Sequence, residues 1–350
     1  MGKLKKLTGY RLFLPLSCLI IVLLINLITT PTFFRITINN GVLYGYIIDV
    51  INRASELVVL AVGMTLVVSA SAGTDISVGA VMAVAAAVCT RVLAGGEVSV
   101  NEYANPYVLA VLAALAAAVV CGGFNGLLVA KLKIQPMVAT LILFTAGRGI
   151  SQLVTNGQIT YIRVDGYKLL GNNIPGIPIP TPIFVAVIVV ALTYILLKKT
   201  AMGMYIQSVG INERASRLVG LKSVKIIWMA YAFCGLCAGI AGLVASSRIY
   251  SADANNIGLN MELDAIAAVA LGGNSLGGGK FSLLGSVIGA YTIQALTTTL
   301  YAMSVPADQI PVYKAIVVIL IVAVQSEELK KFRKRLASRH SSKNVEGGVA

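Results

Sequence analysis

The chain has 350 residues, 57% of them hydrophobic and 12% charged, with a mean hydropathy of +0.85, whereas an average soluble domain carries about 25% charged residues. This composition excludes an ordinary soluble protein and indicates an integral membrane protein in contact with a lipid bilayer. The formal net charge of +14 is compatible with nucleic-acid binding, but the basic residues fall in clusters between apolar runs. Such clustering is typical of membrane topology, so we expect no nucleic-acid partner.

The apolar runs predict the membrane-spanning helices, since a crossing needs about 20 apolar residues. The first run, at 12–29, is followed by no small-x-small cleavage site, so we expect a retained helix rather than a signal peptide. The run from Leu57 to Ala94 is too long for one crossing, and it predicts two helices broken at "SAGTDISVG", residues 71–79. Further helices are predicted at 107–130, 136–154, 182–197, 226–246, 282–303 and 311–325.

The first break contains a charge. Asp75 is the only charged residue between Glu56 and Arg91. A charge inside the bilayer costs a few kcal/mol or more unless it faces protein or water. We expect the Asp75 carboxylate to accept backbone N–H groups at the start of the helix from Val78 and to contact passing hydroxyl groups.

Positive charge decides how the short apolar run 262–272 is interpreted. Twenty of the 28 Lys and Arg residues lie at 3–11, 131–133, 198–225, 280 and 330–343. If these clusters face the cytoplasm, the number of crossings is even, so 262–272 crosses and its glycine-rich end completes the passage. The prediction is an all-α membrane protein of about ten transmembrane helices with both termini in the cytoplasm. Its parts are a cytoplasmic N-terminus at 1–11, a transmembrane domain at 12–325 with the cytoplasmic segment 198–225, and a basic cytoplasmic tail at 326–350.

Conventional catalytic groups are scarce. The one histidine, His340, lies in the basic tail, which excludes histidine metal sites and Ser-His triads. The stretch "GGNSLGGGKF" does not fit a phosphate-binding loop, because Asn274 and Phe281 occupy the places of a glycine and of Ser or Thr. Cys234 and Cys237 form a CxxC within an apolar helix and are interpreted as packed thiols. We expect no enzymatic activity, no metal and no cofactor in this chain.

Two glycine-rich interruptions occur at corresponding places, each about 17 residues after a glutamate, Glu56 or Glu262. Irregular backbone at membrane depth survives only where it is buried or lines water, so paired breaks indicate a transport path. The alternative is that the glycines only allow close helix packing. The predicted helix breaks are Gly73, Gly79, Gly272, Gly273 and Gly277, and the polar residues that favour a path are Asp75, Ser77, Asn274 and Ser275.

Longer motifs carry a family resemblance. "AGTDISVG" is similar to a "GGIDLSVG" motif, from which Ala72 and Thr74 depart, and "NGLLVAKLKIQPMVATLILFTAGRGISQLVTNGQ" keeps Asn-Gly, Pro, Ala-Thr-Leu and Arg-Gly positions. Over nearly its whole length the chain resembles permease subunits of bacterial ATP-binding-cassette importers for ribose, xylose, arabinose and galactofuranose. "SADANNIGLNMELDAIAAV" is similar to the galactofuranose type in particular. Asn125 and Arg148 match this pattern and join the predicted substrate pathway.

The segment "SVGINERASRLVGLKSVK" also resembles these permeases, and the resemblance implies a short helix that docks onto an ATPase subunit. Asn212 can cap such a helix, Glu213 favours its first turn and Gly220 can end it. The predicted docking residues are Gly210, Asn212, Glu213, Ala215, Arg217 and Gly220. A plain basic cytoplasmic loop is the alternative.

The resemblance implies a permease of the cell (inner) membrane that carries a monosaccharide, galactofuranose or a related sugar. It implies three kinds of partner: ATPase subunits that bind ATP and magnesium, a second permease of the same or a different sequence, and an extracytoplasmic sugar-binding protein. Three alternatives remain. A branched-chain amino-acid permease has the same plan, a channel or ion-coupled carrier needs no docking helix, and a membrane enzyme needs catalytic groups.

Overall fold

The computed structural model describes residues 12–39 and 41–325, so the predicted cytoplasmic N-terminus at 1–11 and basic tail at 326–350, with His340, lie outside the described residues. A helix occupies each of the ten apolar runs. In chain order these helices are α2 (Phe13–Thr29), α3 (Tyr46–Ser71), α4 (Val78–Ala94), α5 (Tyr107–Ala130), α6 (Pro136–Val154), α8 (Thr181–Lys199), α11 (Ser223–Ile249), α12 (Met261–Leu271), α13 (Leu283–Ala302) and α14 (Ile310–Gln325).

Six of these helices are long and apolar enough to cross a membrane: α3, α5, α6, α8, α11 and α13. Helices α2, α4 and α14 are also apolar but shorter. Helix α12 has 11 residues, about half of what a crossing needs. The chain is therefore a multi-pass membrane protein, and the count of ten crossings stays a prediction.

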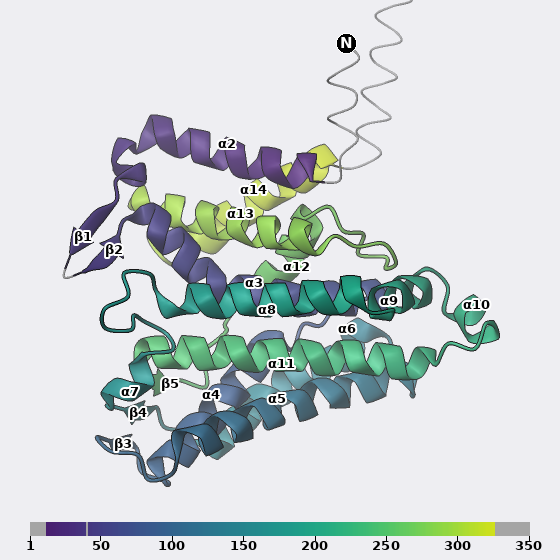
Figure 1. Ribbon diagram of the computed structural model, residues 1–350, viewed down its shortest axis with the longest axis horizontal. Coiled ribbons are helices and arrows are strands. Elements are labelled where there is room, and N and C mark those ends of the chain that lie inside the picture. Colours follow the sequence, from purple (N-terminus) through teal and green to yellow (C-terminus); the bar gives the residue numbers. More distant parts are fainter. Residues whose placement is uncertain (1–11, 40, 326–350) are drawn as a thin grey trace, which may run out of the picture.

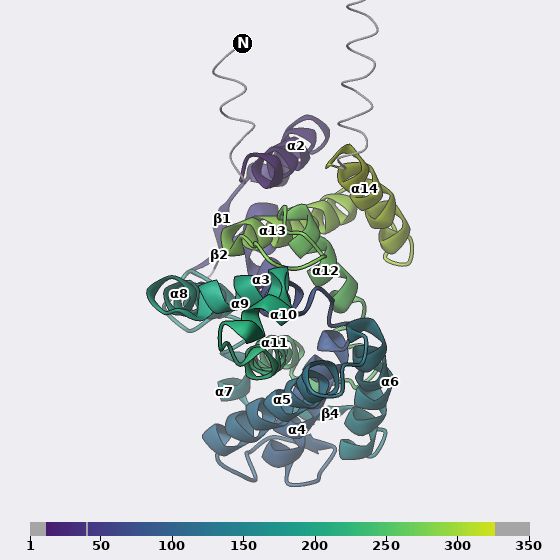
Figure 2. The same ribbon diagram turned by 90° about the vertical axis from the view of Figure 1, so that its right-hand side faces the viewer.

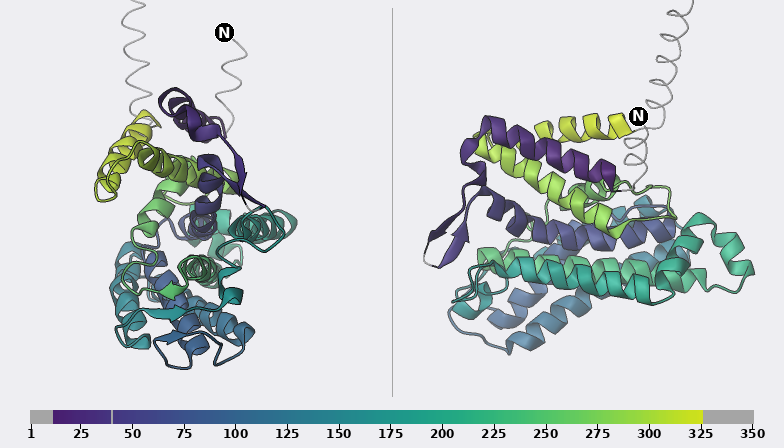
Figure 3. Two further views of the ribbon diagram at one scale, coloured as in Figure 1. Left: turned by 90° about the vertical axis from the view of Figure 1, so that its left-hand side faces the viewer. Right: turned by 45° about the horizontal axis from the view of Figure 1, so that its top comes forward.

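Helices α3 and α11 form the centre of the bundle (Figures 1 and 2). Of the residues in the apolar stretch of α3, 89% are buried inside the protein, against 22% in α8. Helices α4, α5 and α6 lie on one side of this centre, and α2, α13 and α14 lie on the other (Figure 3). The central helices thus bury their apolar surface against protein, while the outer helices leave theirs for lipid or another subunit.

Small residues hold α5 against α11. A Cβ atom on Gly122 would lie 2.9 Å from the Cα atom of Gly235, and a Cβ on Gly235 would lie 2.9 Å from the Cα of Gly122. No side chain fits at either position, because the two backbones touch. In a bilayer, where apolar burial does not drive helices together, such close approach supplies the packing contacts that do.

The bundle has two different ends. At one end, called the α10 end, lie α9 (Met202–Ile211) and α10 (Glu213–Leu218), and here α2 begins and α14 ends (Figure 1). At the opposite β4 end, β3 (Ser99–Val100) pairs with β4 (Thr160–Ile162) in parallel, and β4 pairs with β5 (Ser251–Ala252) antiparallel. The hairpin of β1 (Thr37–Asn39) and β2 (Val42–Tyr44), the 3-10 helix η1 (Pro31–Phe34) and the short helix α7 (Asp165–Lys168) also lie there.

The break between α3 and α4 lies where the sequence predicts it, but α3 begins earlier than predicted. The helix begins at Tyr46 rather than at Leu57. Its first turns are polar, and Glu56 in them pairs with Arg248 of α11 at 3.0 Å. The interpretation of Cys234 and Cys237 as packed thiols is confirmed: they form no disulfide, and both lie beside Gly63 of α3.

The two ends of the bundle should lie on opposite faces of the membrane. Glu102 is exposed at the β4 end, and Leu218 is 89% exposed at the α10 end. We expect Glu102→Cys and Leu218→Cys to react with a membrane-impermeant maleimide from opposite sides, measured in intact and in opened cells. The unchanged protein is the control, because its cysteines are buried or half-buried. Labelling of both variants from the same side would contradict the arrangement.

Candidate functional site

The break between α3 and α4 is held by side chains from other helices. Ala72 leaves α3 in the left-handed conformation, with φ of 52°. The next free backbone groups find partners on α3 and α6: the N–H of Asp75 lies 3.5 Å from the sulfur of Met64, and the N–H of Ile76 donates to Thr140 Oγ1 at 3.2 Å. Irregular backbone within the apolar bundle is thereby satisfied by protein rather than by water.

The Asp75 carboxylate is the centre of a buried cluster. Its Oδ1 atom accepts the backbone N–H of Ser77 at 2.9 Å, the Ser77 hydroxyl at 2.6 Å and the Asn125 amide at 3.4 Å. Asn125 also donates to Ser77 Oγ at 2.8 Å. The prediction that Asp75 accepts a backbone N–H at the start of α4 is confirmed. Asp75 is 2% exposed and the other two residues 0%, so a substrate does not reach them in this conformation.

Of the predicted break glycines, Gly73, Gly272, Gly273 and Gly277 lie between helices, whereas Gly79 lies in the first turn of α4. Gly73, Gly79 and Gly272 do not adopt positive φ. A Cβ on Gly73 would overlap the ring of Pro136, one on Gly79 would overlap Gly258 and the Glu262 carboxylate, and one on Gly272 would lie 2.5 Å from the backbone of Gly285. At these three positions the close approach requires glycine. Positive φ angles occur at Gly273 and also at Gly278 and Gly279, which were not among the predicted break residues, whereas Gly277 has none.

Asn274 fastens the second break to the bundle. Its Oδ1 accepts the backbone N–H of Ser282, and its amide donates to the Val269 carbonyl at 3.1 Å and to Ser286 Oγ at 2.8 Å. Ser286 bonds in turn with Thr65 of α3 at 2.6 Å. Ser275 lies apart from this cluster: it is exposed and accepts the N–H of Gly277. The second break is therefore tied to α12, α13 and α3.

Arg148 lies elsewhere, towards the segment that enters α12. Its Nη1 donates to the carbonyls of Ala254 and Ile257, the first at 3.0 Å. Its Nη2 is buried without a hydrogen-bond partner among the described residues, and so is Oε2 of Glu262, which is 3% exposed. Arg148 therefore clamps an irregular stretch of backbone and keeps one donor for a further polar group.

A hollow of about 270 Å³ lies beside this segment. Its polar lining comes from Glu56, Arg248, Asp253 and Asn256. Arg248 bonds Glu56 and also donates to Asn52. Glu56 was predicted only as a marker of spacing and Arg248 was not predicted, although opposite charges in two apolar helices are a signal for such a pair. Glu56 and Arg248 in this lining are paired with each other, whereas the Asp253 carboxylate accepts the backbone N–H groups of Asn255 and Asn256.

The predicted capped helix at the α10 end is confirmed. Asn212 Oδ1 accepts the backbone N–H of Ala215 at 3.0 Å, and Gly220, with φ of 86°, follows the last turn. Gly210 was predicted to belong to this helix, but it lies in α9. Ala215 is exposed. The apolar side chains of Leu218 and Val219, which the sequence analysis did not include, are 89% and 77% exposed.

Glu213 fixes α10 to the bundle. It accepts bonds from Lys133 after α5, from Arg217 one turn later and from Ser223 of α11. Partial burial raises the pKa of the Glu213 carboxyl, but the bonds and charges of Lys133 and Arg217 outweigh it, so the pKa lies below its ordinary value and the carboxylate is charged. Arg217 is therefore partly committed to internal bonds, which leaves Leu218, Val219 and Ala215 as the surface open to a partner.

The bonds of Asp75 predict how substitutions at this residue change folding. In Asp75→Asn the side chain keeps an acceptor oxygen for Ser77, so we expect folded protein and partial activity. In Asp75→Leu three buried donors lose their partner, each at a cost of about 1–3 kcal/mol, so folded yield and thermal stability should drop severely. The milder variant Ser77→Ala, which removes one hydroxyl, should fall in between. Full yield and stability of the leucine variant, measured by size-exclusion chromatography and thermal unfolding, would show that Asp75 is dispensable.

The chain is similar to known permeases. Residues 46–325 match the family described as the branched-chain amino acid transport system permease component. The galactofuranose transporter permease protein YtfT of Escherichia coli (strain K12) is 44% identical over 93% of this chain and 92% of that protein. The fructose import permease protein FruF of Bifidobacterium longum (strain NCC 2705) is 37% identical over 99% of this chain and 96% of that protein.

The ribose import permease protein RbsC of Escherichia coli (strain K12) is 35% identical over 89% of this chain and 93% of that protein. No solved structure matches the chain. The family match and the relatives agree with a multi-pass helical membrane protein. The chain therefore belongs to the branched-chain amino acid transport system permease family, among the sugar permeases of ATP-binding-cassette importers.

Proposed function

We propose that this chain is the permease of an importer that uses ATP to carry a neutral monosaccharide across the cell (inner) membrane. ATP is bound and hydrolysed by separate ATPase subunits, which dock on α10, while a sugar-binding protein delivers the sugar at the β4 end. The observation that best supports this proposal is α10, a capped helix that Glu213 fixes in place and that has exposed apolar residues at its end. A loop that served topology alone would need neither the cap nor the exposed Leu218.

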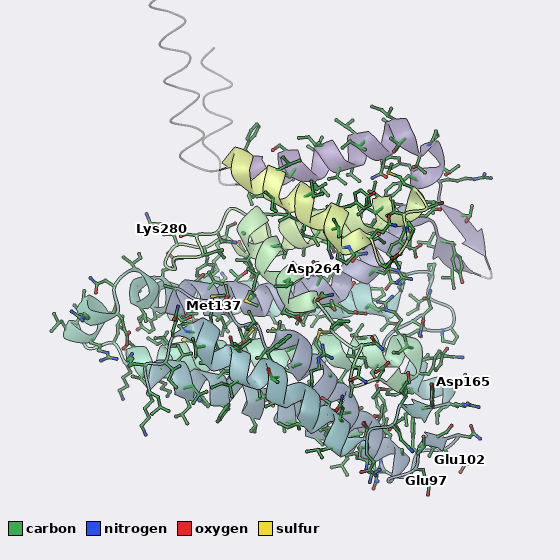
Figure 4. The ribbon with its side chains drawn as sticks, turned by 180° about the vertical axis from the view of Figure 1, so that it is seen from behind. Glu97, Glu102, Met137, Asp165, Asp264 and Lys280 are labelled. Carbon is green, nitrogen blue, oxygen red and sulfur yellow. The ribbon has the colours of Figure 1, made fainter. Side chains whose placement is uncertain are left out.

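The distribution of charge supports the orientation. Lys280 lies near the α10 end, whereas Glu97, Glu102 and Asp165 lie at the β4 end (Figure 4). The basic stretches at 131–133, 198–199 and 214–225 also belong to loops of the α10 end. Since positively charged loops stay in the cytoplasm, the α10 end is the cytoplasmic one, and both termini are cytoplasmic because α2 begins and α14 ends there.

Contacts of α12 support the count of ten crossings. The eighth crossing, which contains α12, differs from the prediction in where its irregular backbone lies. Gly258 and Glu262, at the start of α12, lie against Gly79 of α4, and Gly272 at its end lies against Gly285 of α13. The irregular segment 253–260 connects β5 to this helix. The passage is thus completed by irregular backbone before α12, rather than only by the glycine-rich stretch after it.

The relatives favour a sugar over a branched-chain amino acid, although the family description names the latter. An amino acid brings a carboxylate and an ammonium group, which need unpaired charges to bind. In the hollow at the β4 end, Glu56 and Arg248 are paired with each other, and Asp253 is held by the N–H groups of Asn255 and Asn256. Such paired groups suit hydroxyl groups, which donate and accept hydrogen bonds without net charge.

The pathway residues divide into two roles on this proposal. Arg148, with its unpaired donor, lies near the entrance and contacts the sugar. Asp75, Ser77, Asn125 and Asn274 hold the two breaks and come into contact with sugar only when the helices move apart. Ser275, exposed at the α10 end, lies at the exit. A second permease, the same chain or a different one, completes the path along the surfaces that the outer helices leave open.

Substrate class is tested with the reconstituted importer, that is, permease, ATPase subunits and binding protein in liposomes. We expect ATP-dependent uptake of a labelled monosaccharide, with galactofuranose, fructose and ribose as the first candidates. Unlabelled sugar should compete and leucine should not. Competition by leucine together with absent sugar uptake would assign the chain to the amino-acid alternative, and uptake without ATP would indicate an ion-coupled carrier or channel.

Docking on α10 is tested at its most exposed apolar residue. Burying a leucine side chain is worth about 1.5–3 kcal/mol, so Leu218→Asp should weaken binding of the ATPase subunit by roughly 10- to 100-fold. Because Leu218 touches little of its own chain, folded yield should not change. Ile38→Asp places the same charge on a residue that is 71% exposed at the opposite end and serves as the control. Unchanged copurification of the ATPase with Leu218→Asp would contradict docking at this helix.

A further inference from the structure

The two breaks meet at a single backbone hydrogen bond. Ser69 lies in the last turn of α3, and the last carbonyls of a helix need partners from outside it. The Ser69 carbonyl oxygen accepts the backbone N–H of Gly279 at 3.0 Å. Gly279 belongs to the loop 272–282, the second break, and its φ of 86° turns the N–H towards α3. One break therefore caps the helix that leads into the other.

Gly210 of α9 lies directly on this bond. A Cβ atom on Gly210 would overlap the Ser69 carbonyl oxygen and would lie 2.7 Å from the nitrogen of Gly279. A Cβ on Gly278 would lie 3.0 Å both from the Gly210 carbonyl oxygen and from the Cβ of Ala72. The backbone of α9 thus touches the end of α3 and the loop 272–282 at once, with no side chain between them.

A stiff joint connects this contact to α10. The N–H of Asn212 donates to the Ser208 carbonyl at 3.1 Å, and the Asn212 carbonyl accepts the N–H of Ser216 at 3.0 Å. Asn212 is therefore the last link of α9 and the first of α10. Only Ile211 separates Gly210 from this joint. Packed backbones do not deform smoothly, so a displacement of α10 passes to whatever the backbone at Gly210 touches.

We propose that Gly210 is the positioning residue through which α10 moves both breaks together. The inference rests on the proposed function, in which the ATPase moves α10, and it adds the point where that motion divides. At the end of α3 the motion reaches the break that contains Asp75. At Gly279 it reaches the loop that Asn274 ties to α13. Both halves of the path then change in the same step.

The test compares sugar transported with ATP hydrolysed in the complete reconstituted importer. Gly210→Ala pushes α9 off the junction and should lower the sugar-to-ATP ratio by roughly 2- to 30-fold, the span of typical coupling changes. The ATPase should still copurify, because α10 itself is unaltered. Gly149→Ala, on α6, adds the same methyl group where no atom lies within 4 Å and should keep the wild-type ratio.

A second variant covers the case in which Gly210→Ala fails to fold. Ile211 is 64% exposed, so Ile211→Gly should fold normally while it loosens the joint beside Gly210, and it should also lower the ratio. If Ile211→Gly, and Gly210→Ala where it folds, transport as much sugar per ATP as the wild type, Gly210 is a packing residue and the proposal is wrong. If the wild-type permease neither binds the ATPase nor imports sugar, the proposed function fails instead, so the two failures are distinguishable.

Discussion

The structure depends on hydrogen-bond partners for backbone N–H and C=O groups that lie outside helices and away from water. Where α3 ends at Ser71 and α4 begins at Val78, and again between α12 and α13, the chain leaves the helical hydrogen-bond pattern inside an apolar bundle. Each unpaired peptide group there would cost several kcal/mol. A few short polar side chains supply hydrogen-bond partners for these groups, and one backbone bond, from the N–H of Gly279 to the carbonyl of Ser69, connects the two breaks. The positions of four helices follow from these few partners.

Glycine makes those partners reachable. At Gly73, Gly79 and Gly210 a Cβ atom would overlap a neighbouring residue, so each glycine lets a backbone or a ring approach where a side chain would hold it away. The same device joins α5 to α11 through Gly122 and Gly235. Polar bonds fix the breaks and glycine contacts fix the distances, so the sequence needs both in the same segments. This is why the breaks are rich in glycine although only some of these glycines have positive φ.

Local features were predictable from the sequence, and partners distant in the chain were not. Apolar length places the helix ends within a few residues for most runs, and the cap at Asn212 follows from its own neighbours, since its bond reaches only three residues ahead. The early start of α3 was missed because polar residues such as Asp49, Arg53 and Glu56 interrupt its apolar pattern, and the partner of Glu56, Arg248, lies 192 residues away. Asp75 was recognised as a helix-start acceptor, but its partner Asn125 comes from another helix.

The helices are held together by two kinds of contact, close backbone packing and ion pairs, which resist movement to different degrees. Helices α5 and α11 touch backbone to backbone, so any relative shift meets a steric barrier at once. By contrast, an ion pair of Lys314 with Asp264 links α14 to α12, and another, of Arg248 with Glu56, lines the hollow at the β4 end. Both pairs are mostly buried, so they part only where water or a hydroxylated ligand satisfies the separated groups. On the proposed function, the contacts that part for a sugar lie along α12 and beside Glu56, while α5 and α11 form the fixed frame.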